Sequence, residues 1–126
     1  MSNLAVVLAV AAGALHIGVG LVEAFLFHHR WAQQFLLHKD FSPREVDLWA
    51  FSVGFYNMFL GVGPILGVLL VSAGSADAGR ALVLYTTAFM TLTGVTLFVA
   101  DRRLWPGAVG DTALGLAAFL VTLTST

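Results

Sequence analysis

A histidine and a glutamate in the first apolar stretch of this sequence have the types and the spacing for acid–base chemistry. His16 and Glu23 lie seven residues apart, so two helical turns place both side chains on one helix face. In the second apolar stretch, an amide and a phenol can orient an oxygen atom of a bound molecule. The predicted catalytic residues are therefore His16, Glu23, Tyr56 and Asn57. The first two would act as proton donor and acceptor.

Such a set suits isomerisation or ring chemistry on an isoprenoid, a sterol-like compound or an epoxide. Three other functions use the same groups: transport with a proton relay, an accessory subunit whose polar contacts only fix packing, and haem binding with His16 as axial ligand. Transporters favour broken helices or inverted repeats in both halves, whereas the polar groups here lie almost entirely in the first half. We predict binding or conversion of a small hydrophobic molecule. A non-catalytic accessory, ligand-binding or transport subunit is the alternative, and the sequence identifies no cofactor.

Composition limits the class of protein in which these residues act. The chain has 126 residues, of which 59% are hydrophobic and 10% are charged, against about 25% charged in soluble domains. So few charges exclude an ordinary soluble globule and predict a single-domain integral membrane protein, residues 1–126, surrounded by membrane lipids. The net charge of −1 and the lack of a basic tract give no support for a nucleic-acid partner. The absence of cysteine excludes disulfides and thiolate metal sites.

Four apolar stretches are candidates to cross a bilayer, which takes about 20 helical residues. They cover residues 4–27, 48–71, 81–100 and 108–124, and the last is short for a span. A signal peptide is the alternative for the first stretch, but residues 1–3 hold no Lys or Arg and the apolar run is too long. Short later connections predict an all-α, up-down four-helix bundle in the membrane.

The connection between the first two spans is predicted to lie at the cytoplasmic interface of the membrane. Trp31, Phe35 and other apolar residues recur there among polar and charged ones, which suits a segment at headgroup level. The run Ser42-Pro43-Arg44-Glu45 has the pattern of a helix start, with Ser42 as N-cap. Three histidines are either metal ligands or, more commonly, interfacial residues: His28, His29 and His38.

Small residues mark faces on which the first two spans can approach each other closely. In the first span they share the face of His16 and Glu23. The two stripes consist of Gly13 and Gly20 in the first span, and of Gly54, Asn57 and Gly61 in the second.

Depth counted along each helix predicts which polar groups meet. His16 lies about 16 Å from the cytoplasmic end of its span, Asn57 about 14 Å and Glu23 about 6 Å. His16 is therefore expected beside Asn57 in antiparallel neighbours. Asp111, about 4 Å below the start of the fourth span, would join Glu23 at the mouth of a cavity that opens to the cytoplasm. The interpretation that we favour for Asp111 is an acid in the first turn of its helix.

Two further patterns have structural interpretations. Five threonines of the third span are predicted to bond carbonyls of their own helix: Thr86, Thr87, Thr91, Thr93 and Thr96. Residues 63–67 contain a GxxxG pattern, which indicates either a contact between copies of the chain in a homo-oligomer or room for a kink at Pro64.

The first two spans also resemble a known family. Residues 15–25 (LHIGVGLVEAF) and 54–60 (GFYNMFL) resemble domain-of-unknown-function family 1304. Members are small four-span bacterial membrane proteins that pair a His and a Glu seven apart in helix one with a Gly-x-Tyr-Asn-x-Phe-Leu run in helix two. The matching positions here include His16, Glu23, Tyr56 and Asn57. The resemblance implies a four-span membrane fold and gives no activity.

This chain departs from the family pattern at two places. Ser52-Val53 stands where the family commonly has Asn-Gln before the glycine, and Trp105-Pro106-Gly107 replaces a Gln-Gly-Gly-Pro-like turn. If those amides contribute to a site in the family, the site of this protein is altered.

The positive charges are distributed unequally between the two sides of the predicted bundle. Five lie in the first and third connections and one in the second: Arg30, Lys39, Arg44, Arg102 and Arg103 against Arg80. Because cationic loops stay in the cytoplasm, we predict a multi-pass protein of the inner (plasma) membrane with both termini outside the cytoplasm.

Reporter fusions test this orientation. A reporter that is active only outside the cytoplasm should be active when fused at Thr126 and when inserted within residues 72–80. Cytoplasmic activity at either position would overturn the predicted orientation.

Overall fold

The computed structural model describes residues 1–37 and 44–125 of the chain. The expected helix start at Ser42 and Pro43, and His38 in the first connection, lie outside the described residues. Within them the chain is helical and has no strand. The elements are α1 (Asn3–Phe25), α2 (Arg30–Leu37), α3 (Arg44–Ser72), α4 (Ala76–Ala100), the 3₁₀ turn η1 (Arg102–Leu104) and α5 (Trp105–Thr124).

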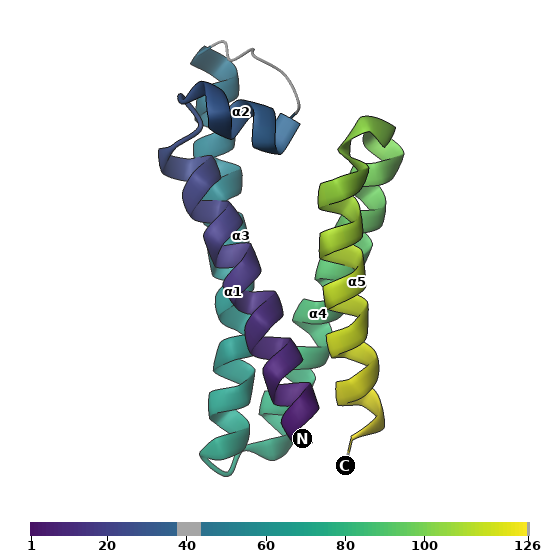
Figure 1. Cartoon of the computed structure of the whole chain (residues 1–126). Coiled ribbons are helices and arrows are strands. Elements are labelled where there is room, and N and C mark those ends of the chain that lie inside the picture. Colours follow the sequence, from purple (N-terminus) through teal and green to yellow (C-terminus); the bar gives the residue numbers. More distant parts are fainter. Residues whose placement is uncertain (38–43, 126) are drawn as a thin grey trace.

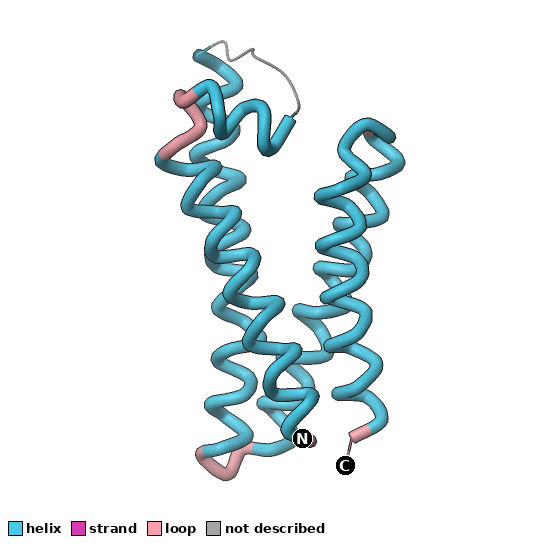
Figure 2. The backbone as a smooth tube through the Cα atoms, viewed as in Figure 1, coloured by secondary structure: helices cyan, strands magenta, loops and turns pink. Residues whose placement is uncertain are grey.

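The four long helices run alternately up and down, with both termini at one end of the bundle (Figures 1 and 2). This confirms the all-α four-helix bundle. α1 packs on α3 and α5, and α4 packs on the same two helices. The pairs α1–α3 and α4–α5 lie close together at the end that holds both termini and separate toward the end where α2 lies (Figure 1). We call these the terminal end and the α2 end.

The length and composition of these helices are those of membrane spans. α1, α4, most of α3, and α5 together with η1 are each long and apolar enough to cross a bilayer. Two helices begin earlier than expected. α4 begins at Ala76, next to Ser75 at its N-cap position, and α5 begins at Trp105, with Pro106 in its first turn. Proline suits that position because its ring pre-sets a helical φ angle.

The short helix α2 turns away from the axis of α1 at the α2 end of the bundle (Figure 1). The Gln33 side chain is buried and its Nε2 donates a 2.9 Å hydrogen bond to the carbonyl oxygen of Phe27. Trp31 and Phe35, one turn apart, are both exposed. An exposed aromatic face on a short helix is the feature expected of an interfacial segment.

Glycine backbones bring α1 and α3 into direct contact. A Cβ atom added to Gly54 would lie 2.6 Å from the carbonyl oxygen of Gly20. Gly13 and Gly61 face each other in the same way, seven residues further along each helix. The predicted stripes of small residues therefore form the interface between these two helices.

The glycines of the GxxxG pattern also pack within the chain. Gly67 lies against Gly79 and Val83 of α4, and Gly63 lies against Thr86. Pro64 is fully buried and α3 continues through it. The pattern therefore serves the α3–α4 interface, and the prediction of a homo-oligomer gains no support from it.

The threonines of α4 bond their own helix, as predicted. Hydroxyl oxygens donate to carbonyls three or four residues earlier at 2.7–3.0 Å, for example from Thr87 to Val83 and from Thr91 to Thr87. These bonds satisfy the hydroxyl groups without a partner helix. Among the described residues, the buried hydroxyl of Thr122 in α5 is an exception, because it has no hydrogen-bond partner.

Arg80 joins two helices at the terminal end. Its guanidinium donates hydrogen bonds of 3.2 and 3.3 Å to the carbonyl of Thr122 and one of 2.7 Å to that of Leu123. These carbonyls belong to the last turn of α5, where no further helical N–H is available. A cation there also interacts favourably with the helix dipole. Arg80, the cation of the second connection, thus has a structural role.

The substitution Gly54→Ala tests the contact between α1 and α3. Its Cβ would press on the backbone of Gly20 and lie 2.8 Å from Cβ of Ala24. Overpacking of this kind costs about 1–3 kcal/mol, so the thermal midpoint of the purified protein in detergent should fall. The matched control is Gly18→Ala, because nothing lies within 4 Å of a Cβ built there. Alanine favours a helix over glycine by about 1 kcal/mol, so this control should keep or raise the midpoint. An unchanged midpoint for Gly54→Ala would contradict the close approach.

Candidate functional site

Glu23 and Asn57 meet across the α1–α3 interface. The side-chain Nδ2 of Asn57 donates a hydrogen bond to Oε1 of Glu23. Both side chains are half-buried. The carboxyl group of Glu23 therefore has a hydrogen-bond donor within an apolar surrounding, where an unpaired carboxylate would be costly.

The glycine contacts explain why Asn57 pairs with Glu23. Gly20 packs on Gly54, and the two helices are antiparallel. Asn57, three residues after Gly54, therefore lies level with residue 17, three residues before Gly20. Side chains lean toward the N-terminus of their own helix. In these antiparallel helices Glu23 and Asn57 lean toward each other, whereas His16 and Asn57 lean apart. The expected contact between His16 and Asn57 is therefore wrong, although the two residues lie at nearly the same level.

His16 instead faces α5. The side chain is 4% exposed, and its Nε2 atom lies 3.7 Å from Oδ1 of Asp111. The other ring nitrogen, Nδ1, lies 3.1 Å from the carbonyl oxygen of Ala12, one turn earlier in α1. A carbonyl oxygen only accepts hydrogen bonds, so Nδ1 bears a hydrogen and donates it to Ala12.

One further proton between His16 and Asp111 would make this contact favourable. With a hydrogen on Nδ1, a neutral imidazole presents a lone pair at Nε2, which repels an ionised carboxylate. The contact is favourable as imidazolium opposite carboxylate, or as imidazole opposite carboxylic acid. In both forms the pair holds one exchangeable proton. The 3.7 Å separation is longer than a hydrogen bond, so this is a close polar contact that a small movement converts into one.

Asp111 lies deeper in its helix than the sequence analysis expects. α5 begins at Trp105 and has no acidic residue in its first turn, so Asp111 is in the second turn. Because α5 begins three residues before position 108, Asp111 lies about 4.5 Å further from the start of the helix than expected. The favoured interpretation of Asp111 as a first-turn acid is therefore wrong. Asp111 lies 3.7 Å from His16, and it also interacts electrostatically with Glu23, the residue that it is expected to join.

The two pairs form one group of side chains. Asp111 and Glu23 are near enough for their carboxyl groups to interact electrostatically. We use the name polar cluster for this set from α1, α3 and α5: His16, Glu23, Asn57 and Asp111. The polar cluster can hold and exchange protons at the imidazole of His16 and at two carboxyl groups. The amide of Asn57 holds the carboxyl group of Glu23 in place.

Tyr56, the remaining predicted catalytic residue, lies outside the polar cluster. Its side chain is 69% exposed. Consecutive residues of a helix point about 100° apart, so a position beside Asn57 in sequence does not bring the phenol to the same face. The role of Tyr56 in orienting a substrate stays a prediction.

His28 and His29 of the first connection lie at the α2 end. The rings of His28 and His29 are 4.1 Å apart, and both side chains are exposed. Among the described residues, no three His, Asp or Glu side chains come together as a metal site would need. For haem, the Nε2 atom of His16 that would serve as axial ligand faces Asp111 instead.

Sequence reasoning missed Asp111 as the partner of His16. The sequence does contain a signal for the correct depth, because Pro106 marks the first turn of α5. Counting from that proline, rather than from the first long apolar run, places Asp111 well inside the helix. The rotation of α5 that turns Asp111 toward His16 has no comparable signal in the sequence.

Comparison with known proteins agrees with the resemblance of the first two spans. The family model described as "Protein of unknown function (DUF1304)" matches residues 10–123, a range that includes all four members of the polar cluster. No curated protein and no solved structure matches the chain. The match covers nearly the whole chain, and the protein therefore belongs to the DUF1304 family of proteins of unknown function.

Proposed function

We propose that this protein binds a small hydrophobic molecule at the polar cluster and converts it by acid–base chemistry, with isomerisation as the reaction class. One observation supports the proposal above the others. Two pairs that each contain a carboxyl group, Glu23 with Asn57 and His16 with Asp111, come together from three apolar helices. Ionisable groups within membrane spans are costly and are commonly functional.

Isomerisation needs a proton delivered to one atom of the substrate and a proton removed from another. The pair of His16 and Asp111 holds an exchangeable proton, and it delivers that proton to one carbon of the substrate. Glu23, held by Asn57, removes a proton from a second carbon, and the double bond moves between them. Proton transfer from Glu23 back to the pair restores the starting state. The reaction needs no oxidant or reductant.

The positions of the groups suit a substrate that bridges them. His16 and Glu23 are two turns apart on α1, a rise of about 10 Å. Asp111 is the member of the histidine pair that also interacts electrostatically with Glu23. The substrate therefore binds between Glu23 and Asp111, in contact with both carboxyl groups.

We also propose that the α2 end faces the cytoplasm and that the protein lies in the inner (plasma) membrane. Arg30 and the two arginines of η1 lie at the α2 end, and Arg80 lies at the terminal end (Figure 1). In the sequence, five of the six Lys and Arg residues fall in the connections at the α2 end. The positive-inside rule then favours this orientation.

The substitution Glu23→Gln separates chemistry from packing. Glutamine keeps the volume and an oxygen that accepts the bond from Asn57, but it removes the carboxylate that accepts a proton from the substrate. Loss of an acid–base group lowers turnover by about 10²–10⁴-fold, whereas removal of a buried charge is often neutral or stabilising. In cells whose only copy of this protein is the Glu23→Gln variant, we expect the lipid-soluble substrate to accumulate. Its product, an isomer of equal mass, should decrease. Mass spectrometry of lipid extracts with chromatographic separation measures this ratio, and the thermal midpoint in detergent checks folding.

Two further variants complete the design. Asp111→Asn should produce the same accumulation, because it removes the proton shared with His16. Asp101→Asn is the control, since it also removes a carboxyl group but in the exposed ion pair with Arg103. An unchanged isomer ratio in folded Glu23→Gln and Asp111→Asn would leave the cluster with a packing role only and overturn the proposed function.

A further inference from the structure

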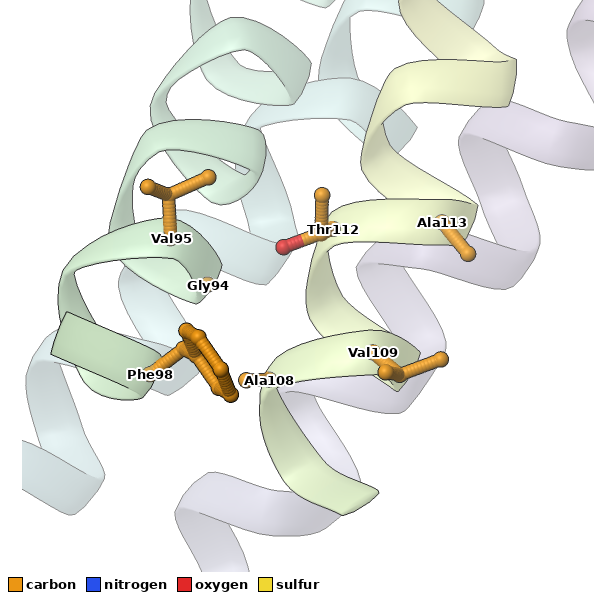
Figure 3. Close-up of a pocket in the computed structure, with 7 residues that line it drawn as sticks. All are labelled: Gly94, Val95, Phe98, Ala108, Val109, Thr112 and Ala113. Carbon is orange, nitrogen blue, oxygen red and sulfur yellow. The ribbon is translucent and has the colours of Figure 1, made fainter. Parts of the chain in front are cut away.

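An apolar groove lies between α4 and α5, on a part of the surface that the proposed function does not use (Figure 3). Its volume is about 370 Å³, within the range of about 300–1,000 Å³ that is usual for small-molecule sites. Val95 and Phe98 of α4 and Val109 and Ala113 of α5 line it. Phe98 is 43% exposed and Val109 is 55% exposed, so the groove is open to the surface.

The floor of the groove is formed by a close approach of the two helices. A Cβ atom on Gly94 would lie 3.0 Å from the carbonyl oxygen of Ala108 and would also press on Thr112. Larger side chains flank this contact, and the ring of Phe98 points toward Ala108 between the helices (Figure 3). The result is a channel with apolar walls along two membrane-spanning helices.

Positive charge lies at the hairpin where the groove ends. Phe98 lies in the last turn of α4, which ends at Ala100, and Arg102 begins η1 directly after Asp101. The carboxylate of Asp101 accepts hydrogen bonds of 3.1 and 2.9 Å from the guanidinium of Arg103. Arg102 is exposed and has no ion pair with any described residue. The first turn of α5 contains no acidic side chain that would repel an anion.

We propose that this groove is a binding site for an anionic phospholipid, with one acyl chain between α4 and α5 and the phosphate at Arg102. The charge complementarity of Arg102 and the apolar walls select such an occupant over a neutral lipid. Trp105, which is 59% exposed at the start of α5, has the position of an interfacial aromatic residue. This site is independent of the polar cluster, so it stands whether or not the proposed reaction occurs.

Lipid titration of the purified protein in detergent tests the site. The probes are dioleoylphosphatidylglycerol, dioleoylphosphatidylcholine with the same chains, and glycerol phosphate without chains. The thermal midpoint should rise with the first lipid at lower concentration than with the second, and glycerol phosphate should have no effect. Arg102→Gln should weaken the apparent affinity for dioleoylphosphatidylglycerol about fivefold, the contribution of one arginine near an anionic surface. Ala113→Phe should fill the groove and remove the binding of that lipid.

Matched controls separate a site from general attraction. Arg30→Gln removes one positive charge at the same end of the bundle, and Ala14→Phe adds the same bulk at an exposed position of α1. Both should bind dioleoylphosphatidylglycerol as the wild type does. If Arg30→Gln and Arg102→Gln weakened the apparent affinity for dioleoylphosphatidylglycerol equally, the binding would reflect non-specific surface charge. This outcome would overturn the proposal. Unchanged binding by Ala113→Phe, or stabilisation by glycerol phosphate alone, would also overturn it.

Discussion

The close backbone contact between α1 and α3 is the constraint on which the rest of this structure depends. In a bilayer, helices gain little from burying apolar side chains against each other, because lipid tails are equally apolar. Close packing of small residues then decides which helices associate. The contact of Gly20 with Gly54, repeated by Gly13 with Gly61, permits one register of the two helices. That register brings Asn57 within hydrogen-bonding reach of Glu23.

The same principle orders the remaining helices. Gly79 packs against Gly67 between α3 and α4, and Gly94 packs against Thr112 between α4 and α5. These three interfaces connect the helices in sequence, so contact between α1 and α5 closes the bundle. Arg80 adds a polar connection at the terminal end, where it donates hydrogen bonds to the last carbonyls of α5. The glycine contacts of α4 and α5 also leave an open groove beside them, which accounts for the second site that we propose.

The polar cluster spans two interfaces: Glu23 and Asn57 meet between α1 and α3, and His16 and Asp111 meet between α1 and α5. Each of its members has a polar partner, which offsets the cost of placing these groups among apolar helices. Hydrogen-bonded polar pairs of this kind can serve helix packing alone. In His16, however, Nδ1 donates its hydrogen to the carbonyl oxygen of Ala12, so Nε2 of the neutral ring faces Asp111 with a lone pair. With that hydrogen in place, a further proton between His16 and Asp111 would make their contact favourable. This contact of a histidine with a carboxyl group, beside the pair of Glu23 and Asn57, supports the proposed acid–base chemistry.

Composition and helical periodicity act locally, so the residues alone predict the membrane class, the four helices and the positions of the glycine stripes. They also predict the self-bonding threonines of α4, since their acceptors lie within the same helix. The partners in the polar cluster depend instead on how the helices pack against one another. Depth counting placed His16 level with Asn57, but the lean of side chains in antiparallel helices turned Asn57 to Glu23. The rotation of α5 toward α1 gave His16 its contact with Asp111. Rotation and tilt depend on how all helices pack together, and no single helix contains that information.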